Sequence, residues 1–200
     1  MTATLRASNS AFPKYPKYNF IDPIRKFDEV EIPVLDTQLS SEGSTSFSQN
    51  LEVGKNAPGM LKATFLTKVY EGGGDFSMDI FSKDLAPFSH FVGLKSPKAR
   101  EYGSYYTDEN TVFDVVSVDA QGRPAANRKL EIKVFQIEWR WWWNRGSDNL
   151  STYENSTVHR PVKDFTVKTD GNGKGKFTVN IPEEEGGRYL IRVIDKQSGH

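Results

Sequence analysis

The sequence contains no cysteine among its 200 residues. This absence excludes disulfide bonds, thiolate metal sites and every mechanism that uses a cysteine nucleophile. Histidine is scarce, since only His90, His159 and His200 are present, and none of them stands in a helical i, i+4 pair or beside a nucleophile motif. The usual signatures of a zinc site and of a hydrolytic triad are therefore missing, and we expect no metal, no cofactor and no enzymatic activity.

Net charge and long apolar runs are missing as well. The 26 Lys and Arg residues balance the 26 Asp and Glu residues, which leaves a formal net charge of zero at pH 7. Such a chain offers no electrostatic footprint for nucleic acid or for an anionic membrane. No apolar stretch approaches the roughly 20 residues that span a bilayer, and residues 1–10 lack the apolar core of a signal peptide. We expect no nucleic-acid partner and no membrane contact, and we interpret the chain as a soluble piece of a longer protein.

What the sequence does contain is period-2 alternation, with β-branched and aromatic residues at the repeating positions. This pattern predicts β-strands, and no window shows convincing helical periodicity. In the first half, strands are predicted at residues 2–7, 30–35, 61–70 and 76–81, and around Phe47, Leu51 and Val53. In the second half, strands are predicted at residues 91–95, 111–119, 129–143, 152–158, 165–169, 176–181 and 188–195. The glycine-rich stretches 72–75 and 170–176 predict hairpin turns.

About seven strands in the second half is the number expected of an immunoglobulin-like sandwich. The predicted fold class is all-β, with two tandem immunoglobulin-like β-sandwich domains. The segment 86–94 contains a proline just ahead of a fresh strand, so we place the domain boundary there and expect domains at residues 1–89 and 90–200. The candidate interdomain pivot consists of Pro87, Phe88, His90 and Phe91.

The predicted strand 129–143 contains all four tryptophans. By parity, its apolar face changes between Val134 and Phe135, so a single buried face requires a β-bulge or a sharp twist at that point. By parity Trp142 points away from the other tryptophans, and its indole could lie over Arg140, Arg145 or a neighbouring strand, with a cation–π interaction at either arginine. Two interpretations stay open: the tryptophans fill a sandwich core, or Trp142, Arg140 and Arg145 form an interaction surface for a sugar or a partner protein.

Two acidic segments bear a superficial likeness to metal sites. The run 170–176 (DGNGKGK) begins like a calcium loop, but Ile181 stands where that loop requires a carboxylate. Glu183, Glu184 and Glu185 are consecutive and precede two glycines, which is typical of a solvated loop. We therefore expect a turn in the first segment and no metal in either.

Several short motifs occur together in one order. The second half contains VDAQGRP at 118–124, the tryptophan strand, GRYLIRV at 187–193 and DKQSGH at 195–200. The first half contains YNFIDP at 18–23, KVYEGGGDF at 68–76 and FVGL at 91–94. In this order they resemble the macroglobulin-type β-sandwich domains of bacterial alpha-2-macroglobulins, and the resemblance covers nearly the whole chain.

The resemblance implies two consecutive macroglobulin-type domains of an endopeptidase inhibitor that traps proteases. In that family a protease cuts an exposed bait segment, the domains rearrange, and a thioester often links the attacker covalently. The thioester motif, Cys-x-Glu-Gln, cannot reside in a chain without cysteine. No bait segment is assigned either, because the irregular stretch 145–161 is short and lies inside a domain.

The implied role is structural. The implied partners are other domains of the same full-length protein and, through the whole trap, proteases. The implied location is the periplasm, cell envelope or extracellular space of a bacterium, with the full-length protein anchored by lipid. A carbohydrate-binding or adhesion module of a bacterial surface protein remains the alternative, because sandwiches host many functions and the tryptophans could bind sugar directly.

Overall fold

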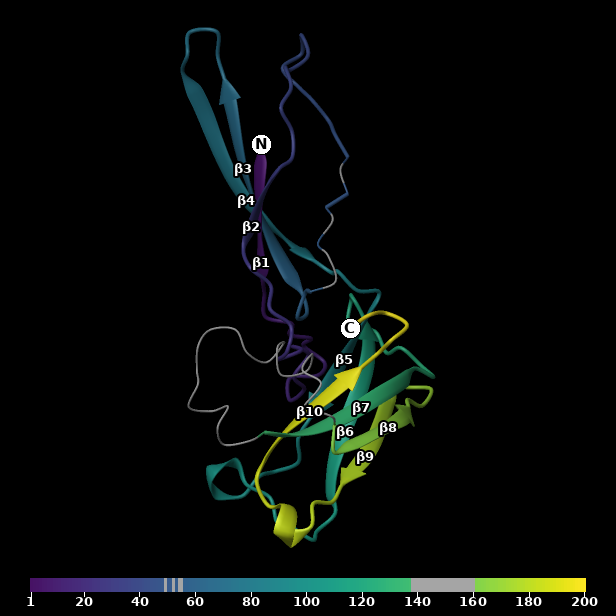
Figure 1. The fold of residues 1–200 in the computed structure, drawn as a ribbon. Helices are drawn as coiled ribbons and strands as arrows, with labels where there is room; N and C mark the ends of the chain where they lie inside the picture. The colour runs from purple at the N-terminus through teal and green to yellow at the C-terminus, as the bar shows by residue number, and fades with distance from the viewer. Residues whose placement is uncertain (49, 52, 54–55, 138–160) are drawn as a thin grey trace. The chain divides into compact units, whose positions relative to one another are not determined.

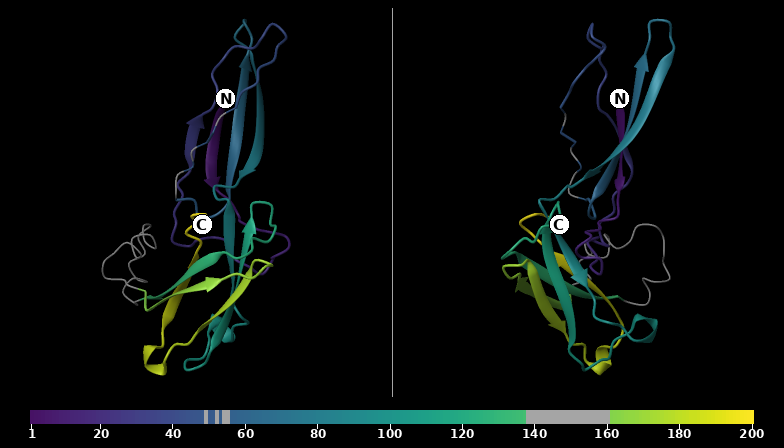
Figure 2. Two further views of the ribbon diagram at one scale, coloured as in Figure 1. Left: turned by 90° about the vertical axis from the view of Figure 1, so that its right-hand side faces the viewer. Right: turned by 180° about the vertical axis from the view of Figure 1, so that it is seen from behind.

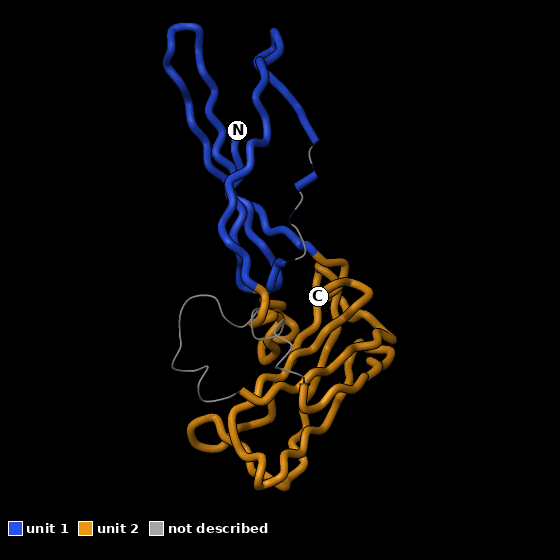
Figure 3. The backbone as a smooth tube through the Cα atoms, in the orientation of Figure 1, with its two compact units in different colours: residues 1–9, 26–87 blue, residues 10–25, 88–200 orange. Residues whose placement is uncertain are grey.

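The computed structural model describes residues 1–48, 50–51, 53, 56–137 and 161–200 of the chain (Figure 1). These residues form ten β-strands and two short 3-10 helices, which confirms the all-β fold class. They divide into two compact units (Figure 3): unit 1 contains residues 1–9 and 26–87, and unit 2 contains residues 10–25 and 88–200. None of the helices in the described ranges has the length and apolar character that crossing a membrane requires.

Unit 1 is built on one antiparallel sheet with the strand order β2-β1-β3-β4 (Figure 1). Its strands are β1 (Thr2–Ala7), β2 (Val30–Pro33), β3 (Leu61–Tyr70) and β4 (Phe76–Leu85). Alternate residues of a strand point to the same side, and one side of β1 and β3 buries Ala3, Leu5, Leu61 and Ala63 completely. The predicted hairpin at residues 72–75 joins β3 to β4.

The predicted strand around Phe47, Leu51 and Val53 is wrong for the described residues of that segment, because none of them lies in a strand. Phe47 is 44% exposed. The stretch 40–50 is dominated by serine, glycine, glutamine and asparagine, which form strands poorly, and its apolar residues are too widely spaced for alternation.

Unit 2 contains a sandwich of two antiparallel sheets, β5-β6-β9 and β10-β7-β8 (Figure 2). Its strands are β5 (His90–Lys95), β6 (Thr111–Asp119), β7 (Lys129–Ile137), β8 (Lys163–Lys168), β9 (Lys174–Val179) and β10 (Arg188–Ile194). Its 3-10 helices are η1 (Glu101–Gly103) and η2 (Glu183–Glu185). The core between the sheets consists of Val92, Phe113, Val115, Leu130, Ile132, Val134, Phe177 and Val179. The further strand predicted near residues 152–158 lies outside the described residues.

Strand β7 contains no β-bulge, so of the two alternatives predicted near Val134 the bulge is wrong and the sharp twist stays a prediction. Its pairing with β10 is continuous from Ile137 opposite Arg188 to Glu131 opposite Ile194. Val134 is completely buried and the adjacent Phe135, which points to the opposite face, is only 2% exposed. Because both faces are covered at this point, the two side chains can point in opposite directions without an extra residue. The tryptophan-bearing part of the predicted strand, residues 138–143, lies outside the described residues.

The glycine-rich stretch 170–176 forms a tight turn but does not join a paired hairpin. Asp170 donates its N–H to the carbonyl of Lys174 at 2.7 Å, and its Oδ1 accepts the N–H groups of Asn172 and Lys174. The two strands that the turn connects belong to different sheets, since β8 pairs with β7 and β9 pairs with β6. The turn therefore carries the chain from one layer of the sandwich to the other.

Residues 10–25 belong to unit 2, although most of unit 1 follows them in the sequence. This differs from the expected division at residues 89 and 90. Asn19 and Leu94 of β5 exchange two backbone hydrogen bonds of 2.9 Å, and Phe12, Phe20 and Ile24 are buried. The chain consequently passes between the two units at residues 9–10, 25–26 and 87–88.

Candidate functional site

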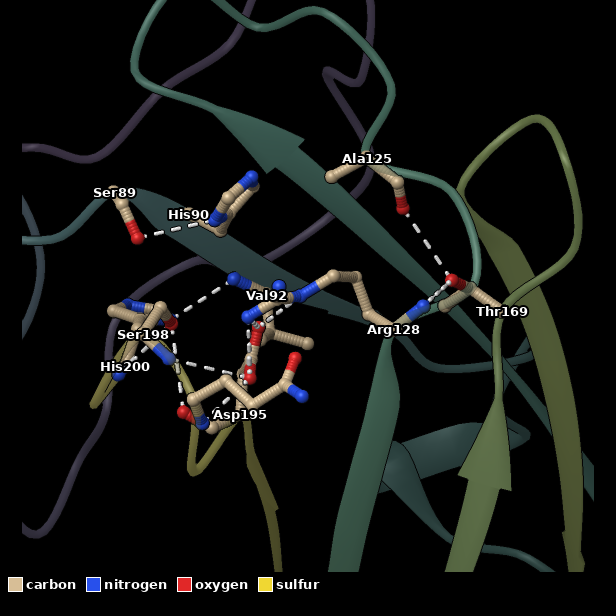
Figure 4. A network of polar contacts seen from close by, with 10 residues as sticks. Ser89, His90, Val92, Ala125, Arg128, Thr169, Asp195, Ser198 and His200 are labelled. Atoms are coloured by element: carbon tan, nitrogen blue, oxygen red, sulfur yellow. Dashed lines mark hydrogen bonds and ion pairs between the residues drawn. The ribbon is translucent and has the colours of Figure 1, made fainter.

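The best-organised polar site of unit 2 is a loop at residues 195–200, which Figure 4 shows together with Arg128. Asp195 is completely buried. Its Oδ1 accepts the N–H of Gln197 at 3.0 Å, and its backbone N–H donates to the carbonyl of His200 at 2.6 Å. Arg128, just before β7, donates from Nε to Oδ2 at 2.8 Å and from Nη2 to Oδ1 at 2.9 Å. The loop is therefore closed on itself and held by a bidentate ion pair, which fixes geometry as well as charge.

His200 connects this loop to two other segments of unit 2. Its Nδ1 accepts the backbone N–H of Val92 at 2.9 Å, and its Nε2 lies 3.0 Å from the carbonyl oxygen of Phe20 (Figure 4 shows the first contact). Because a backbone N–H can only donate, Nδ1 is unprotonated and Nε2 carries the proton. Burial lowers the pKa of His200 to about 4, against the opposing effects of its hydrogen bond to Phe20 and of the charge of Asp22. The imidazole is therefore neutral and serves as a structural link.

An aromatic cluster surrounds the His200 ring. The rings of Phe88 and Phe91 each lie 5.1 Å from it, and Phe12 lies 4.6 Å from Phe20 and 5.6 Å from Phe91. These centroid distances are typical of favourable edge-to-face and tilted aromatic contacts. The cluster forms a second apolar core of unit 2, on the face of β5 opposite the one that lines the sandwich.

Gly93 makes this second core possible. A Cβ atom at that position would lie 2.6 Å from the ring of Phe20, which is closer than real Cβ atoms approach a neighbour. A glycine inside a strand often marks such a close approach. The FVGL and YNFIDP motifs of the sequence are thus explained by one contact between β5 and the segment 10–25.

A second buried ion pair joins the segment 10–25 to β10. Arg192 donates from Nε at 3.0 Å and from Nη2 at 2.7 Å to Oδ2 of Asp22. The side chain of Arg192 is 8% exposed and that of Asp22 is 6% exposed. Arg25 lies 3.3 Å from the same carboxylate and donates to the carbonyl of Gly199 at 2.6 Å. The segment 10–25 is therefore bonded both to the sandwich and to the loop 195–200.

A cleft of about 630 Å³ opens in unit 2 between the edge strands β5 and β10. Val92 and Leu94 line it from β5, and residues 188–193 line it from β10. Tyr102 of η1 lines its side, together with Tyr105 and Tyr106 from the loop that follows η1. The lining is mainly apolar, as is usual for a binding site, and the charged pair in its wall, Asp22 and Arg192, is bonded internally. The cleft offers a surface for binding, and the described residues around it place no nucleophile beside a base.

The structure places the residues predicted from the sequence as follows. Pro87 is the last residue of unit 1, and Phe88 begins the second segment of unit 2. Phe88 and Phe91 are buried in the aromatic cluster, and Nδ1 of His90 lies 3.1 Å from Oγ of Ser89. A pivot at this junction stays a prediction. The proposed interaction surface of Trp142, Arg140 and Arg145 lies outside the described residues and also stays a prediction.

The two acidic segments that resemble metal sites, residues 170–176 and 183–185, form a turn and a short helix. The carboxylate of Asp170 holds the turn, and Glu183–Glu185 form the exposed helix η2. The part of the chain that the structure describes contains no group of three or more His, Asp or Glu residues that could hold a metal ion.

Sequence reasoning did not single out Asp22, Arg128, Arg192 or Asp195, and it considered His200 only as a possible metal ligand or catalytic residue. Their partners are far away in the chain, since Arg128 and Asp195 are 67 residues apart and Val92 and His200 are 108 residues apart. The one local signal was Gly93, a glycine in the middle of a predicted strand.

Comparisons with known proteins identify the type of domain. A family model described as bacterial macroglobulin domain 6 matches residues 93–200. A crystal structure of a Salmonella alpha-2-macroglobulin mutant is similar, with 17% identity and a TM-score of 0.54 over 99% of this chain and 13% of that chain. Salmonella alpha-2-macroglobulin reacted with methylamine gives 18% identity and a TM-score of 0.53 over 98% of this chain and 13% of that chain.

The native conformation of E. coli alpha-2-macroglobulin gives 18% identity and a TM-score of 0.48 over 98% of this chain. No curated protein sequence matches the chain. At these identities the likeness to the Salmonella structures extends to the fold alone, and the chain spans about 13% of their length.

Proposed function

This chain belongs to the bacterial macroglobulin domain 6 family, and from that premise we propose that it forms non-catalytic structural domains of a bacterial alpha-2-macroglobulin-like endopeptidase inhibitor. The protease-trapping chemistry then resides in the remainder of a longer protein, of which this chain is one part. Its partners are the other domains of that protein, and it meets proteases only through the assembled trap.

The observation that supports a structural role most directly is how unit 2 uses its buried charges. Asp22 bonds to Arg192, and Asp195 bonds to Arg128, so each of these carboxylates has an arginine partner within the unit. Buried carboxylates that are paired in this way hold segments of the unit together. Three of these four residues, Asp22, Arg192 and Asp195, belong to the 18–23, 187–193 and 195–200 motifs, which accounts for the presence of those motifs.

A structural domain of a trap acts through its stiffness. Two sheets, the segment 10–25 and the loop 195–200 are joined in unit 2 by buried ion pairs and by the aromatic cluster. A domain packed in this way moves as a rigid body. When one neighbouring domain moves, such a domain moves with it and passes the displacement on to the next domain without changing its own shape.

The proposal is tested with the full-length gene product and with the 200-residue chain side by side. Each is incubated with a serine protease, and the remaining cleavage of a large protein substrate and of a small peptide substrate is measured. We expect the full-length protein to protect the large substrate and to leave the small one accessible, whereas the 200-residue chain protects neither. Failure of the full-length protein to inhibit would refute the trap, and retention of the chain on immobilised polysaccharide would favour the carbohydrate-binding alternative.

We also propose that the full-length protein is located in the periplasm or cell envelope and is anchored by lipid. Fractionation of the source bacterium, followed by immunoblotting for this chain, tests the location. Recovery in the cytosolic fraction would contradict it.

A further inference from the structure

Strand β4 leaves one edge of the unit 1 sheet open. In the order β2-β1-β3-β4 it pairs only with β3, and no described residue pairs with its other side. Nine of its ten residues are exposed. Its register with β3 is continuous from Leu85 to Phe76, and it contains no proline, so neither a bulge nor a proline protects the edge.

β4 also exposes large apolar side chains on both faces. Phe76, Met78 and Ile80 are 53%, 57% and 59% exposed and share one face. Phe81 points to the other face, is 39% exposed and stacks on Phe65 with a centroid distance of 4.8 Å. A long, regular and apolar edge of this kind is a template for pairing with another strand.

The hairpin determines which backbone groups face the open edge. Glu71 donates its N–H to the carbonyl of Asp75 at 2.8 Å across the turn. Hydrogen-bonded pairs alternate along an antiparallel ladder, so the pair of Phe65 and Phe81, six positions further, is also hydrogen-bonded. The N–H and C=O groups of the even-numbered residues of β4, Ile80 and Ser82 among them, therefore point to the open edge.

We propose that a second copy of this chain pairs its own β4 antiparallel with this edge, about a two-fold axis that passes through the Phe81 position. In this register Phe81 lies opposite Phe81 of the second copy as a non-hydrogen-bonded pair, in which side chains approach most closely. Ile80 lies opposite Ser82 of the second copy, so the backbone groups that face the open edge meet each other. The two four-stranded sheets then form one continuous sheet.

The charge pattern of β4 selects this partner and this register. Inside the hairpin, Asp79 lies opposite Thr67 and Lys83 lies opposite Ala63, and neither charge has an ion-pair partner among the described residues. In the proposed pair, Asp79 of each copy lies opposite Lys83 of the other, and opposite charges across a ladder are favourable. Sliding one strand by two residues places Asp79 opposite Phe81 or Leu85 and forms no such pair, and sliding it by four places Asp79 opposite Asp79 or Lys83 opposite Lys83, which like-charge repulsion opposes.

Packing supports the same register. The Phe81 rings of the two copies would meet between the Phe65 rings, which gives a row of four aromatic side chains on one face of the continuous sheet. On the other face, Ile80 of each copy becomes a diagonal neighbour of Ile80 of the other, within reach of a long apolar side chain. The pairing does not depend on the proposed trap function.

The first test exchanges the charges. Sedimentation equilibrium of the 200-residue chain should show a monomer–dimer equilibrium, and the variants D79K and K83D should each weaken it roughly tenfold or more, because each creates two like-charge pairs. A mixture of D79K and K83D should restore dimerisation as a heterodimer. Both side chains face neutral neighbours within the hairpin, so the fold is retained, and K98D on an exposed residue of unit 2 is the matched control. A chain that stays monomeric, or charge variants that dimerise as well as the parent, would overturn the proposal.

The second test reads the register directly. The chain has no cysteine, so a single introduced thiol reports on one position. The variant F81C should form a disulfide between two copies under mild oxidation, because Cβ atoms of a directly opposed pair lie within disulfide range. The variant S77C should not, because the register places Leu85 opposite residue 77. Equal crosslinking of both variants, or assembly into larger oligomers, would overturn the proposal.

Discussion

The guanidinium group of Arg128 donates to both carboxylate oxygens of Asp195, 67 residues later in the chain, over distances of 2.8 and 2.9 Å. Asp195 is completely buried, so its charge is compensated by Arg128 and by the N–H groups of its own loop. One side chain therefore joins the beginning of β7 to the loop that ends at His200. The stability of unit 2 should depend strongly on this pair.

Replacing Arg128 tests that dependence. The variant R128A leaves the Asp195 carboxylate buried without its partner, and we expect the free energy of unfolding to fall by about 3–5 kcal/mol. The measurement is urea denaturation followed by circular dichroism. The matched control is R123A, since Arg123 pairs with Asp119 while 71% exposed, and such pairs contribute less than about 1 kcal/mol. Equal effects of the two variants would show that the Arg128–Asp195 pair has no special role.

Replacing Gly93 tests the contact between β5 and the segment 10–25. The variant G93A places a Cβ atom 2.6 Å from the Phe20 ring, and overpacking of this kind costs about 1–3 kcal/mol. Thermal unfolding is the measurement, and the double variant G93A/F20L should recover part of the loss. G72A serves as the control, because a Cβ at Gly72 meets no atom within 4 Å. A G93A protein as stable as the parent would contradict the predicted clash.

The lowered pKa of His200 predicts that the stability of the protein depends on pH. Burial lowers the pKa of His200 from 6.5 to about 4, so between these values the unfolded chain binds a proton that the folded chain does not. The contribution of the neutral His200 imidazole to the free energy of unfolding is therefore fully present above about pH 6.5. It is lost as the pH falls toward 4, by about 3 kcal/mol in total.

The measurement is the free energy of unfolding of the parent and of H200Q at several pH values in this window. Carboxylates that lie away from His200 contribute equally to both proteins, so the difference between the two curves reports on His200 and on its coupling to Asp22 and Asp195. We expect the parent to lose more stability than H200Q on acidification. Parallel curves would show that His200 titrates alike in the folded and unfolded chains.

The ion pairs of Asp22 predict that removing its charge loosens the segment 10–25 locally. The variant D22N removes the charge that Arg192 and Arg25 share, so residues 10–25 should detach from the sandwich more often. Hydrogen exchange measured by mass spectrometry should show faster exchange in peptides from residues 10–25, with β1 and β3 of unit 1 unchanged. Uniform acceleration over the whole chain would instead indicate global destabilisation.

Local patterns predicted the strands well. The observed bounds of β1, β3 and β6 equal those predicted, because alternation of β-branched, aromatic and polar residues expresses which face of a strand is buried. The same rule failed at β7, where Val134 and Phe135 are buried on opposite faces. Alternation assumes one buried face, and it cannot show that a second face is also covered.

The candidate site was much less predictable. The DKQSGH and YNFIDP motifs were visible as motifs, but nothing in them indicates that Arg128 would bond Asp195 or that His200 would bond Val92. A hydrogen bond or ion pair between distant residues leaves no periodicity in the sequence. Gly93 offered a signal that the sequence analysis did not use, because a glycine inside a strand often marks a close approach of another segment.

The sequence by itself determined that this chain folds into β-strands joined by glycine-rich turns, and that it carries no thiol chemistry. These properties follow from residue composition and from interactions between near neighbours. Only the tertiary structure decided that residues 10–25 join unit 2, that β8 and β9 lie in different sheets, and that Asp22, Asp195 and His200 are buried. Those outcomes depend on which apolar and polar surfaces are buried against each other, and this burial arises only when segments far apart in the chain pack together.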